Sequence, residues 1–133
     1  MQSRNFRDLK VWQCGKEIVL QVYQLTGEFP DGEKYGLSSQ MRRAAISIPS
    51  NIAEGFNRYH NKEYRKFLFI SLGSCAELET QLEIAVSLEF FQPENGENVM
   101  DKLDHESRML RKLINSLSVD NEIRDTGNEM RSL

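Results

Sequence analysis

Two long helical patterns joined by a short polar turn occupy residues 37–88. In the first pattern, apolar residues recur at three- and four-residue intervals: Met41, Ala44, Ala45, Ile48 and Ile52. This spacing places them on one face of an α-helix. The second pattern starts after the turn at 57–61 and runs to about residue 90. Because each helix must bury its apolar face against other helices, this pair constrains the chain to an all-α fold.

The second of these helices is apolar on two sides. One stripe has the spacing of a core seam: Tyr64, Phe67, Leu68, Ser71, Cys75, Leu78, Leu82, Ala85 and Val86. The other stripe comprises Ile70, Gly73, Glu77, Ile84 and Leu88. A helix that is apolar on two sides has to be covered on both, and a short four-helix chain has few spare elements. We therefore expect the chain to associate with copies of itself through the second stripe.

Two further helical patterns flank this pair. One precedes it and ends near Thr26, before a turn rich in glycine and proline, and the other follows a loop at 92–96. Four helical patterns with short connections predict an all-α, antiparallel up-and-down four-helix bundle. We expect this domain over residues 1–118 and a polar, disordered C-terminal tail over residues 119–133.

Polar residues and one proline mark the helix ends and a bend. Candidate N-caps of the first three helices are Asp8, Ser38 or Ser39, and Asn61, and the second helix has an alternative start one turn earlier, at Glu33. Pro49 lies inside the second helical pattern, where proline removes one backbone hydrogen bond. We expect a bent helix at this position rather than two separate helices.

The composition is that of one mildly acidic domain. The chain has 133 residues, with 17 Lys and Arg against 20 Asp and Glu, and a formal net charge of −3. Dedicated nucleic-acid binders usually carry a basic excess, so such a function needs a local patch. Cys14 and Cys75 lack Cys-x-x-Cys spacing, and no run approaches the roughly 20 apolar residues that span a bilayer. These features predict a cytoplasmic protein without membrane contact.

The sequence contains no recognisable catalytic or metal-binding arrangement. Its two histidines, His60 and His105, lack the Glu-x-x-His and His-Glu-x-x-His spacings that helical metal sites use. The glycines between 27 and 36 mark turns and do not form a phosphate-binding loop. We therefore predict a protein that is not an enzyme and needs no cofactor, metal or small-molecule substrate.

The charges are distributed unevenly along the chain. Residues 37–66 contain six Lys and Arg against two Glu, whereas residues 67–100 contain six Glu and neither Lys nor Arg. Four charged residues border the apolar stripes: Arg42, Arg43, Glu77 and Glu79. We interpret them first as interhelical or intersubunit ion pairs that fix register, because an unpaired buried charge costs several kcal/mol.

A second interpretation concerns the turn between the two central helices. Four cations cluster there, beside Tyr59 and His60: Arg58, Lys62, Arg65 and Lys66. Lys and Arg neutralise phosphates, and aromatic rings stack on bases, so this cluster fits a nucleic-acid surface. A solvated, charged helix start explains the same residues, and both interpretations stay open.

Several segments of the chain, taken in order, resemble a known protein family. They are FRDLKVW at 6–12, YGLSSQMRRAA at 35–45, SIPSNIAEG at 47–55, GS at 73–74 and AELETQL at 76–82. In this order they closely resemble the bacterial four-helix-bundle proteins encoded in intervening sequences of 23S rRNA genes, over residues 5–118. The resemblance implies an all-α bundle that assembles into a ring-like homo-oligomer, a pentamer.

The accessory variability determinant proteins of diversity-generating retroelements look like relatives of that family. They are basic pentamers that bind nucleic acid and a reverse transcriptase, whereas this chain is acidic overall. It also has Leu72 before Gly73 and Ser74, where many family members carry arginine. The partners that the resemblance implies are copies of the chain itself, and RNA or a nucleic-acid enzyme.

Our leading hypothesis is a non-enzymatic homo-oligomeric scaffold that binds structured RNA. The alternative is a purely structural or protein-interaction module with no nucleic-acid contact. The candidate RNA-binding residues are Arg58, Lys62, Arg65 and Lys66. The candidate residues for an oligomer interface or for helix register are Arg42, Arg43, Ile70, Glu77, Glu79, Ile84 and Leu88.

Overall fold

The structure is a computed structural model that describes residues 5–33 and 35–117. These residues form four α-helices: α1 (Lys10–Thr26), α2 (Leu37–Phe56), α3 (Asn61–Ser87) and α4 (Glu97–Ser116). Three short 3-10 turns precede α1, α2 and α4: η1 (Phe6–Asp8), η2 (Asp31–Glu33) and η3 (Pro93–Gly96). Within the described ranges there is no strand. The predicted tail at 119–133 lies outside the described residues.

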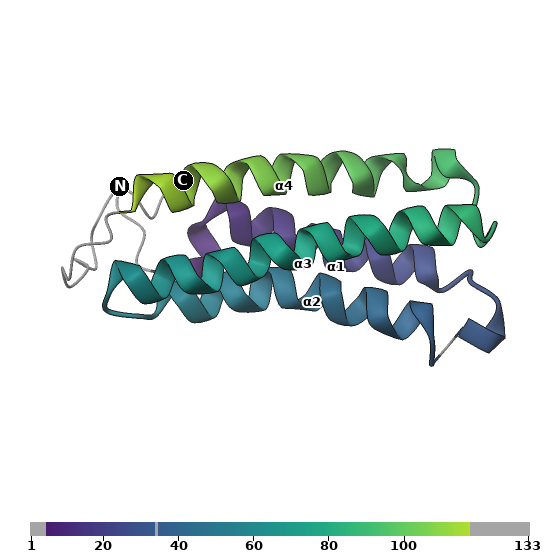
Figure 1. Ribbon diagram of the computed structural model, residues 1–133, viewed down its shortest axis with the longest axis horizontal. Helices are drawn as coiled ribbons and strands as arrows, with labels where there is room; N and C mark the ends of the chain where they lie inside the picture. Colours follow the sequence, from purple (N-terminus) through teal and green to yellow (C-terminus); the bar gives the residue numbers. More distant parts are fainter. Residues whose placement is uncertain (1–4, 34, 118–133) are drawn as a thin grey trace.

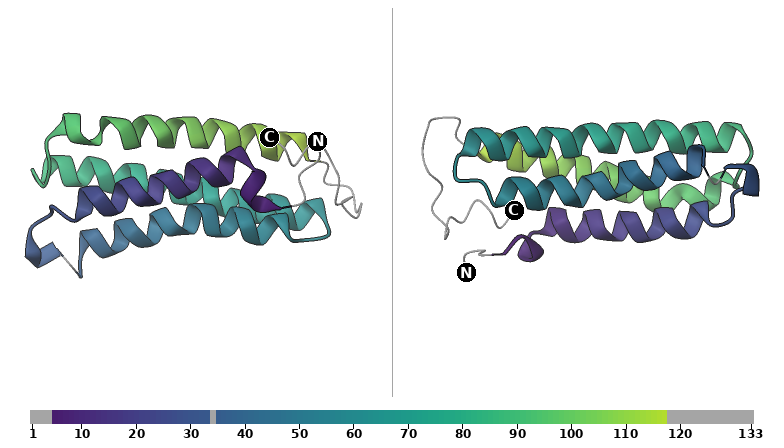
Figure 2. Two further views of the ribbon diagram at one scale, coloured as in Figure 1. Left: turned by 180° about the vertical axis from the view of Figure 1, so that it is seen from behind. Right: turned by 90° about the horizontal axis from the view of Figure 1, so that it is seen from below.

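The four helices lie side by side and alternate in direction (Figures 1 and 2). Each helix packs against the next in the chain, and α4 closes the bundle against α1. The interface between α2 and α3 is the most extensive. The predicted all-α, antiparallel four-helix bundle is therefore confirmed. No helix in the described part of the chain is both long enough and apolar enough to cross a membrane.

The helix starts differ from the predicted caps. The N-cap of α1 is Leu9, whose side chain makes no capping bond, and Asp8 belongs to the preceding 3-10 turn. The N-caps of α2 and α3 are Gly36 and His60, one to three residues before the predicted serine and asparagine caps. The serine and asparagine side chains fail as caps because they fall inside the first turns, where Ser38 and Asn61 are buried. A more distant side chain serves α2 instead, since the Glu33 carboxylate accepts from the Leu37 N–H at 3.3 Å.

Helix α2 continues unbroken through Pro49, as expected. Hydroxyl groups of α3 bond to the turn of α2 that contains the proline. Ser71 Oγ donates to the Ile48 carbonyl at 2.8 Å, and Ser74 Oγ bonds to Ser47 Oγ at 2.8 Å. The first of these contacts is buried and the second partly buried, and together they fix the register of α3 along α2.

Helix α3 ends at Ser87, earlier than the predicted Phe90, because the chain turns sharply there. Glu89 has a left-handed backbone conformation, with φ of 62°. The Phe90 N–H donates to the Ala85 carbonyl at 3.0 Å, and the Glu89 N–H to the Val86 carbonyl at 2.9 Å. This pair of bonds is a Schellman motif, whose left-handed position normally holds glycine.

Glu89→Gly is therefore expected to stabilise the bundle by about 0.5–1 kcal/mol, since glycine adopts the left-handed conformation without steric cost. Urea unfolding monitored by circular dichroism would measure the change. Glu94→Gly is the matched control, because Glu94 is equally exposed but has no left-handed backbone. Equal unfolding midpoints for Glu89→Gly and the unmodified chain would contradict the prediction.

Candidate assembly and nucleic-acid surfaces

The second apolar stripe of α3 faces solvent. Phe69, Ile70, Ile84 and Leu88 are each between 42% and 54% exposed. Gly73 lies among them, and a Cβ atom added there would meet no atom within 4 Å. We call these five residues the outer face of α3. The other three helices of the same chain leave it uncovered, whereas the core seam of α3 is largely buried.

Arg42 contacts its own chain. Its Nε donates to Thr26 Oγ1 at 2.8 Å, and its guanidinium lies 4.4 Å from the centre of the Tyr23 ring. Both partners belong to the last part of α1. No carboxylate in the described ranges forms an ion pair with Arg42. Within the chain, Arg42 thus ties α2 to α1 through a hydrogen bond and a cation–π contact, and an ion pair of Arg42 between subunits stays a prediction.

Arg43 and Glu77 line one polar groove of about 480 Å³ between α2 and α3. Within the described residues they form no ion pair with each other, and Glu77 accepts instead from Gln81 Nε2 at 3.2 Å. Arg43 and Glu77 are exposed, and Glu79 on the same helix is half-buried. A role of these three residues between subunits stays a prediction.

Two of the four candidate RNA-binding cations are held within the chain. Arg58 pairs with Glu54 at 3.1 Å and lies 4.9 Å from the centre of the Phe67 ring. Arg65 donates to the carbonyls of Ile114 and Leu117, at the C-terminal end of α4. The last carbonyls of a helix lack the usual partner four residues on, and the Ile114 carbonyl also accepts from the Leu117 N–H at 3.2 Å, so Arg65 adds to the cap of α4.

The other two cations, Lys62 and Lys66, are exposed on the first turns of α3. No hydrogen bond or ion pair joins them to another described residue. Tyr59, in the preceding turn, is 71% exposed. Lys62, Lys66 and Tyr59 are therefore the members of the predicted patch that remain available to a ligand.

Glu106 in α4 is a buried ionisable residue that the sequence analysis did not single out. It is 0% exposed, and neither of its carboxylate oxygens has a hydrogen-bond partner with ordinary geometry. Burial raises the pKa of Glu106 to about 8, and the nearby Cys14 thiol partly offsets this rise. A Cβ atom added at Gly15 would lie 3.0 Å from Glu106 Oε2, so that glycine makes room for the carboxyl.

The sequence did contain a signal for this burial. Position 106 continues the three- and four-residue spacing of the apolar stripe of α4, between Leu103 and Leu110, and both of these leucines are fully buried. A glutamate at a position of the apolar core stripe is therefore expected to be buried, unless the helix turns about its own axis.

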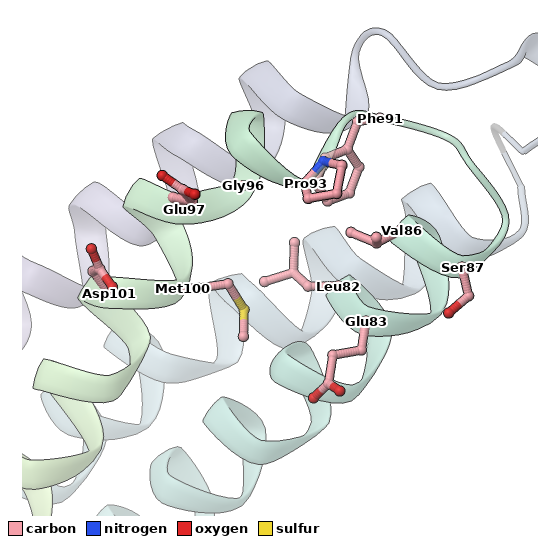
Figure 3. Close-up of a pocket in the computed structure, with 10 residues that line it drawn as sticks. All are labelled: Leu82, Glu83, Val86, Ser87, Phe91, Pro93, Gly96, Glu97, Met100 and Asp101. Carbon is pink, nitrogen blue, oxygen red and sulfur yellow. The ribbon is translucent and has the colours of Figure 1, made fainter.

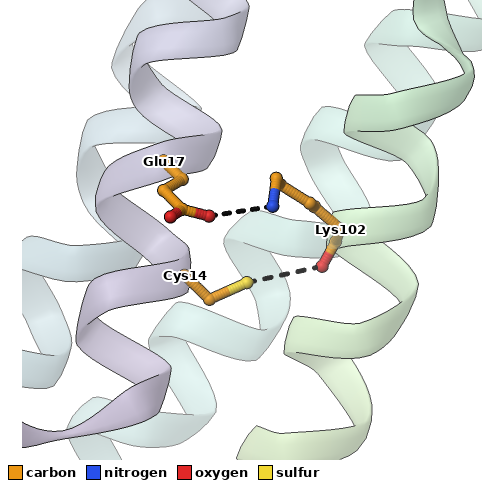
Figure 4. A network of polar contacts seen from close by, with 3 residues as sticks. All are labelled: Cys14, Glu17 and Lys102. Atoms are coloured by element: carbon orange, nitrogen blue, oxygen red, sulfur yellow. Dashed lines mark hydrogen bonds and ion pairs between the residues drawn. The ribbon is translucent and has the colours of Figure 1, made fainter.

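The two cysteines are thiols with little nucleophilic character. Burial, and then the charge of Glu106, raise the pKa of both Cys14 and Cys75 to about 12. Figure 4 shows the Cys14 thiol donating to the Lys102 carbonyl at 3.8 Å, beside an ion pair of 2.8 Å between Lys102 and Glu17. The thiolate is the form of cysteine that reacts and binds metal ions. Because their raised pKa keeps both thiols protonated near neutral pH, neither cysteine is suited to act as a nucleophile or a metal ligand. The described ranges contain no group of three or more His, Cys, Asp or Glu side chains placed to hold a metal ion.

Comparisons with known proteins agree with the fold. The model of a protein family described as 23S rRNA-intervening sequence protein matches residues 7–112, from before α1 to near the end of α4. No curated protein matches the chain. A solved structure, described as a protein with unknown function from the S23 ribosomal protein family of Bacteroides thetaiotaomicron, is 21% identical with a TM-score of 0.71. The match covers 78% of this chain and 97% of that one, and at this identity it shows the fold alone.

Proposed function

The chain belongs to the 23S rRNA-intervening sequence protein family, and we propose that it is a non-catalytic helical-bundle scaffold that assembles with copies of itself. The surface proposed for assembly is the outer face of α3. The family and the solved structure carry no indication of catalysis in their descriptions. The proposal therefore depends on the physical character of that surface.

The observation that carries this proposal is the combination of exposed apolar residues with an unexplained glycine. Scattered exposed apolar side chains are ordinary, but a row of them along 20 residues of one helix is not. Gly73 costs about 1 kcal/mol relative to alanine within a helix, and nothing in the same chain approaches it closely enough to require glycine. Close approach of a second backbone accounts for both features.

A second exposed apolar region favours a closed ring. Leu20 and Tyr23 on α1 and Ile46 on α2 are exposed, and none of them belongs to the outer face of α3. Two different surfaces on one chain suit a heterologous interface, in which each copy presents one surface to each neighbour. Such an interface gives a ring when the rotation closes. Five copies is the number that the family resemblance implies, and we adopt it as the expected count.

Ile84→Glu is expected to convert the oligomer to a monomer at micromolar concentration, because it places a charge in the apolar interface. Lys62→Glu is the matched control, since Lys62 is an exposed residue of the same helix outside the outer face. Size-exclusion chromatography with light scattering would measure the mass of each variant. A monomeric unmodified chain at tens of micromolar, or equal masses for the two variants, would contradict assembly through this face.

The exposed set Tyr59, Lys62 and Lys66 supports a second candidate function, contact with structured RNA. Its two lysines are available for phosphates, and the Tyr59 ring is exposed for stacking. Arg58 and Arg65 contribute less to this surface, because they are engaged within the chain. The rival function is a structural or protein-interaction module that does not contact nucleic acid.

Replacing Lys62 and Lys66 together by Glu is expected to weaken binding to 23S rRNA fragments and to lower the salt slope by about 1.4–1.8, since each phosphate contact contributes about 0.7–0.9. Lys10→Glu with Lys16→Glu, on exposed positions of α1, is the charge-matched control. Arg65 is left intact because its loss would weaken the cap of α4. Electrophoretic mobility at several salt concentrations measures the slope. No shift at about 50 mM salt, where phosphate contacts are strong, would favour the rival function.

A further inference from the structure

A groove opens at the end of the bundle where α3 stops and α4 starts. It has a volume of about 400 Å³ and lies between the two helices. Figure 3 shows Leu82, Val86 and Met100 pointing toward one another on its floor, with Phe91 at one end. Ligand sites are typically concave and lined by apolar side chains of this kind.

The rim of the groove is acidic. Glu83 from α3, and Glu97 and Asp101 from α4, line it, and all three carboxylates are exposed. None of them forms an ion pair within the described ranges. Residues 67–101 contain seven Asp and Glu and neither Lys nor Arg, so the helix ends around the groove supply no cation of their own. The negative potential of the rim is therefore uncompensated locally.

The groove is held open by packing at its end. A Cβ atom added at Gly96 would lie 2.6 Å from the Phe91 ring, so the glycine lets this ring sit against the start of α4. On its other side, Phe91 stacks on Phe29 with ring centres 5.9 Å apart and planes 11° apart. With Phe91 fixed on both sides, the concave shape exists before a partner arrives, and less ordering is needed on binding.

We propose that this groove binds a cationic amphipathic helix of a partner protein. One or two apolar side chains of that helix would enter the groove, and its Lys or Arg residues would pair with Glu83, Glu97 and Asp101. Apolar anchors at helical spacing are the usual way in which a helix binds a groove, and a complementary charge rim gives such binding its specificity and speed. Nucleic acid and anionic membranes are repelled by the same rim.

The partner is a different chain rather than a second copy. The basic surface of this chain, at Lys62 and Lys66, lies at the opposite end of the bundle from the groove (Figure 1). Pairing it with the groove of another copy would be a heterologous contact between opposite ends of the bundle, which gives filaments unless its rotation closes. Glu83 and Ser87 line both this groove and the hollow beside Ile84 and Leu88 of the outer face of α3, so assembly has to be measured separately from partner binding.

The test uses a fluorescent synthetic peptide with leucines at helical spacing and lysines at the remaining positions, and a control peptide with glutamates in place of the lysines. Fluorescence anisotropy at about 50 mM salt is expected to show saturable binding of the lysine peptide and none of the glutamate peptide. Replacing Glu83 and Asp101 together by Lys is expected to weaken binding at least about tenfold. Met100→Gln, which makes the floor polar without altering charge, is expected to weaken it about threefold or more.

The control variant replaces Asp8 and Glu63 together by Lys, which changes net charge equally on exposed residues at the other end of the bundle. It is expected to bind the lysine peptide nearly as well as the unmodified chain. Three results would overturn the proposal: equal binding of the two peptides, equal weakening by the control variant, or binding insensitive to Met100→Gln. A second copy would be the occupant if the unmodified chain formed filaments and bound neither peptide, and if the variant with Lys at positions 83 and 101 formed no filaments. Thermal unfolding of each variant verifies that the bundle is intact, and light scattering reports assembly separately.

Discussion

Raising the pH from about 5 to about 8 is expected to destabilise the bundle by about 3–4 kcal/mol, and Glu106→Gln is expected to remove most of this loss. The cause is the position of Glu106 in the core, where it is 0% exposed and its carboxylate oxygens have no partners. The folded bundle therefore holds this carboxyl in its protonated form.

The direction follows from the pKa of Glu106 in the two states. Its pKa is about 8 in the folded chain, raised by burial from the ordinary value of 4.5. Below pH 4.5 the group is protonated in both states and contributes no pH dependence. Between 4.5 and 8 the unfolded chain loses this proton while the folded chain keeps it, so unfolding becomes more favourable by about 1.4 kcal/mol per pH unit. The pKa values of Cys14, Cys75 and Lys102 are also raised, but they lie above pH 8, so these groups do not contribute to the change between pH 5 and pH 8.

Urea unfolding of the unmodified chain and of Glu106→Gln, at several pH values and one protein concentration, measures this effect. Glutamine has nearly the same shape but does not ionise, so the stability of the variant should change little across the range, and its advantage should grow with pH. Glu83→Gln is the matched control, because Glu83 is an exposed carboxylate on α3. Identical pH dependence in the unmodified chain and in Glu106→Gln would contradict the buried, protonated carboxyl.

The helical periodicity of the sequence was sufficient to predict the bundle. The stripe from Met41 to Ile52 and the seam from Tyr64 to Leu82 identified the core faces of α2 and α3, because a period of 3.6 places such residues together regardless of the rest of the chain. The helix ends were less predictable. Ser38 and Asn61 have the side chains of good caps, but the burial of each helix face fixed its rotation and placed them inside the first turns.

The candidate site was predictable only where it depends on one helix. Spacing along α3 predicted the stripe that contains Ile70, Gly73, Ile84 and Leu88, whereas the exposure of Phe69 beside it was not predicted. The engagement of Arg65 was not predictable from spacing either, because its partners at the end of α4 lie 49 and 52 residues away in sequence and meet it only through the register of α3 against α4. For the same reason, the sequence could not show which cation of the cluster caps a helix and which is available to bind a ligand.

Gly55→Ala is expected to destabilise the bundle by about 2–3 kcal/mol, the range of overpacking in a tightly packed core. Gly55 lies near the end of α2, where α2 and α3 approach most closely before the turn. A Cβ atom added there would be 2.8 Å from the Cβ of Phe67, 3.0 Å from the Tyr64 ring and 3.2 Å from the Tyr64 carbonyl. The nearest of these atoms belongs to the rigid start of a side chain, and another is backbone, so neither moves aside cheaply.

Relief of this overlap would require α3 to shift as a unit. Tyr64 is fully buried, and its ring packs edge to face on Phe56 with centres 6.2 Å apart, so moving it disturbs the core at the α2–α3 turn. Gly32→Ala is the matched control, since a Cβ atom there would meet no atom within 4 Å and the change should stay within about 0.5 kcal/mol. Urea unfolding at constant pH and protein concentration compares the two. Equal midpoints would show that α2 and α3 can separate at this crossing, and the close contact would then not determine how the two central helices of the bundle pack.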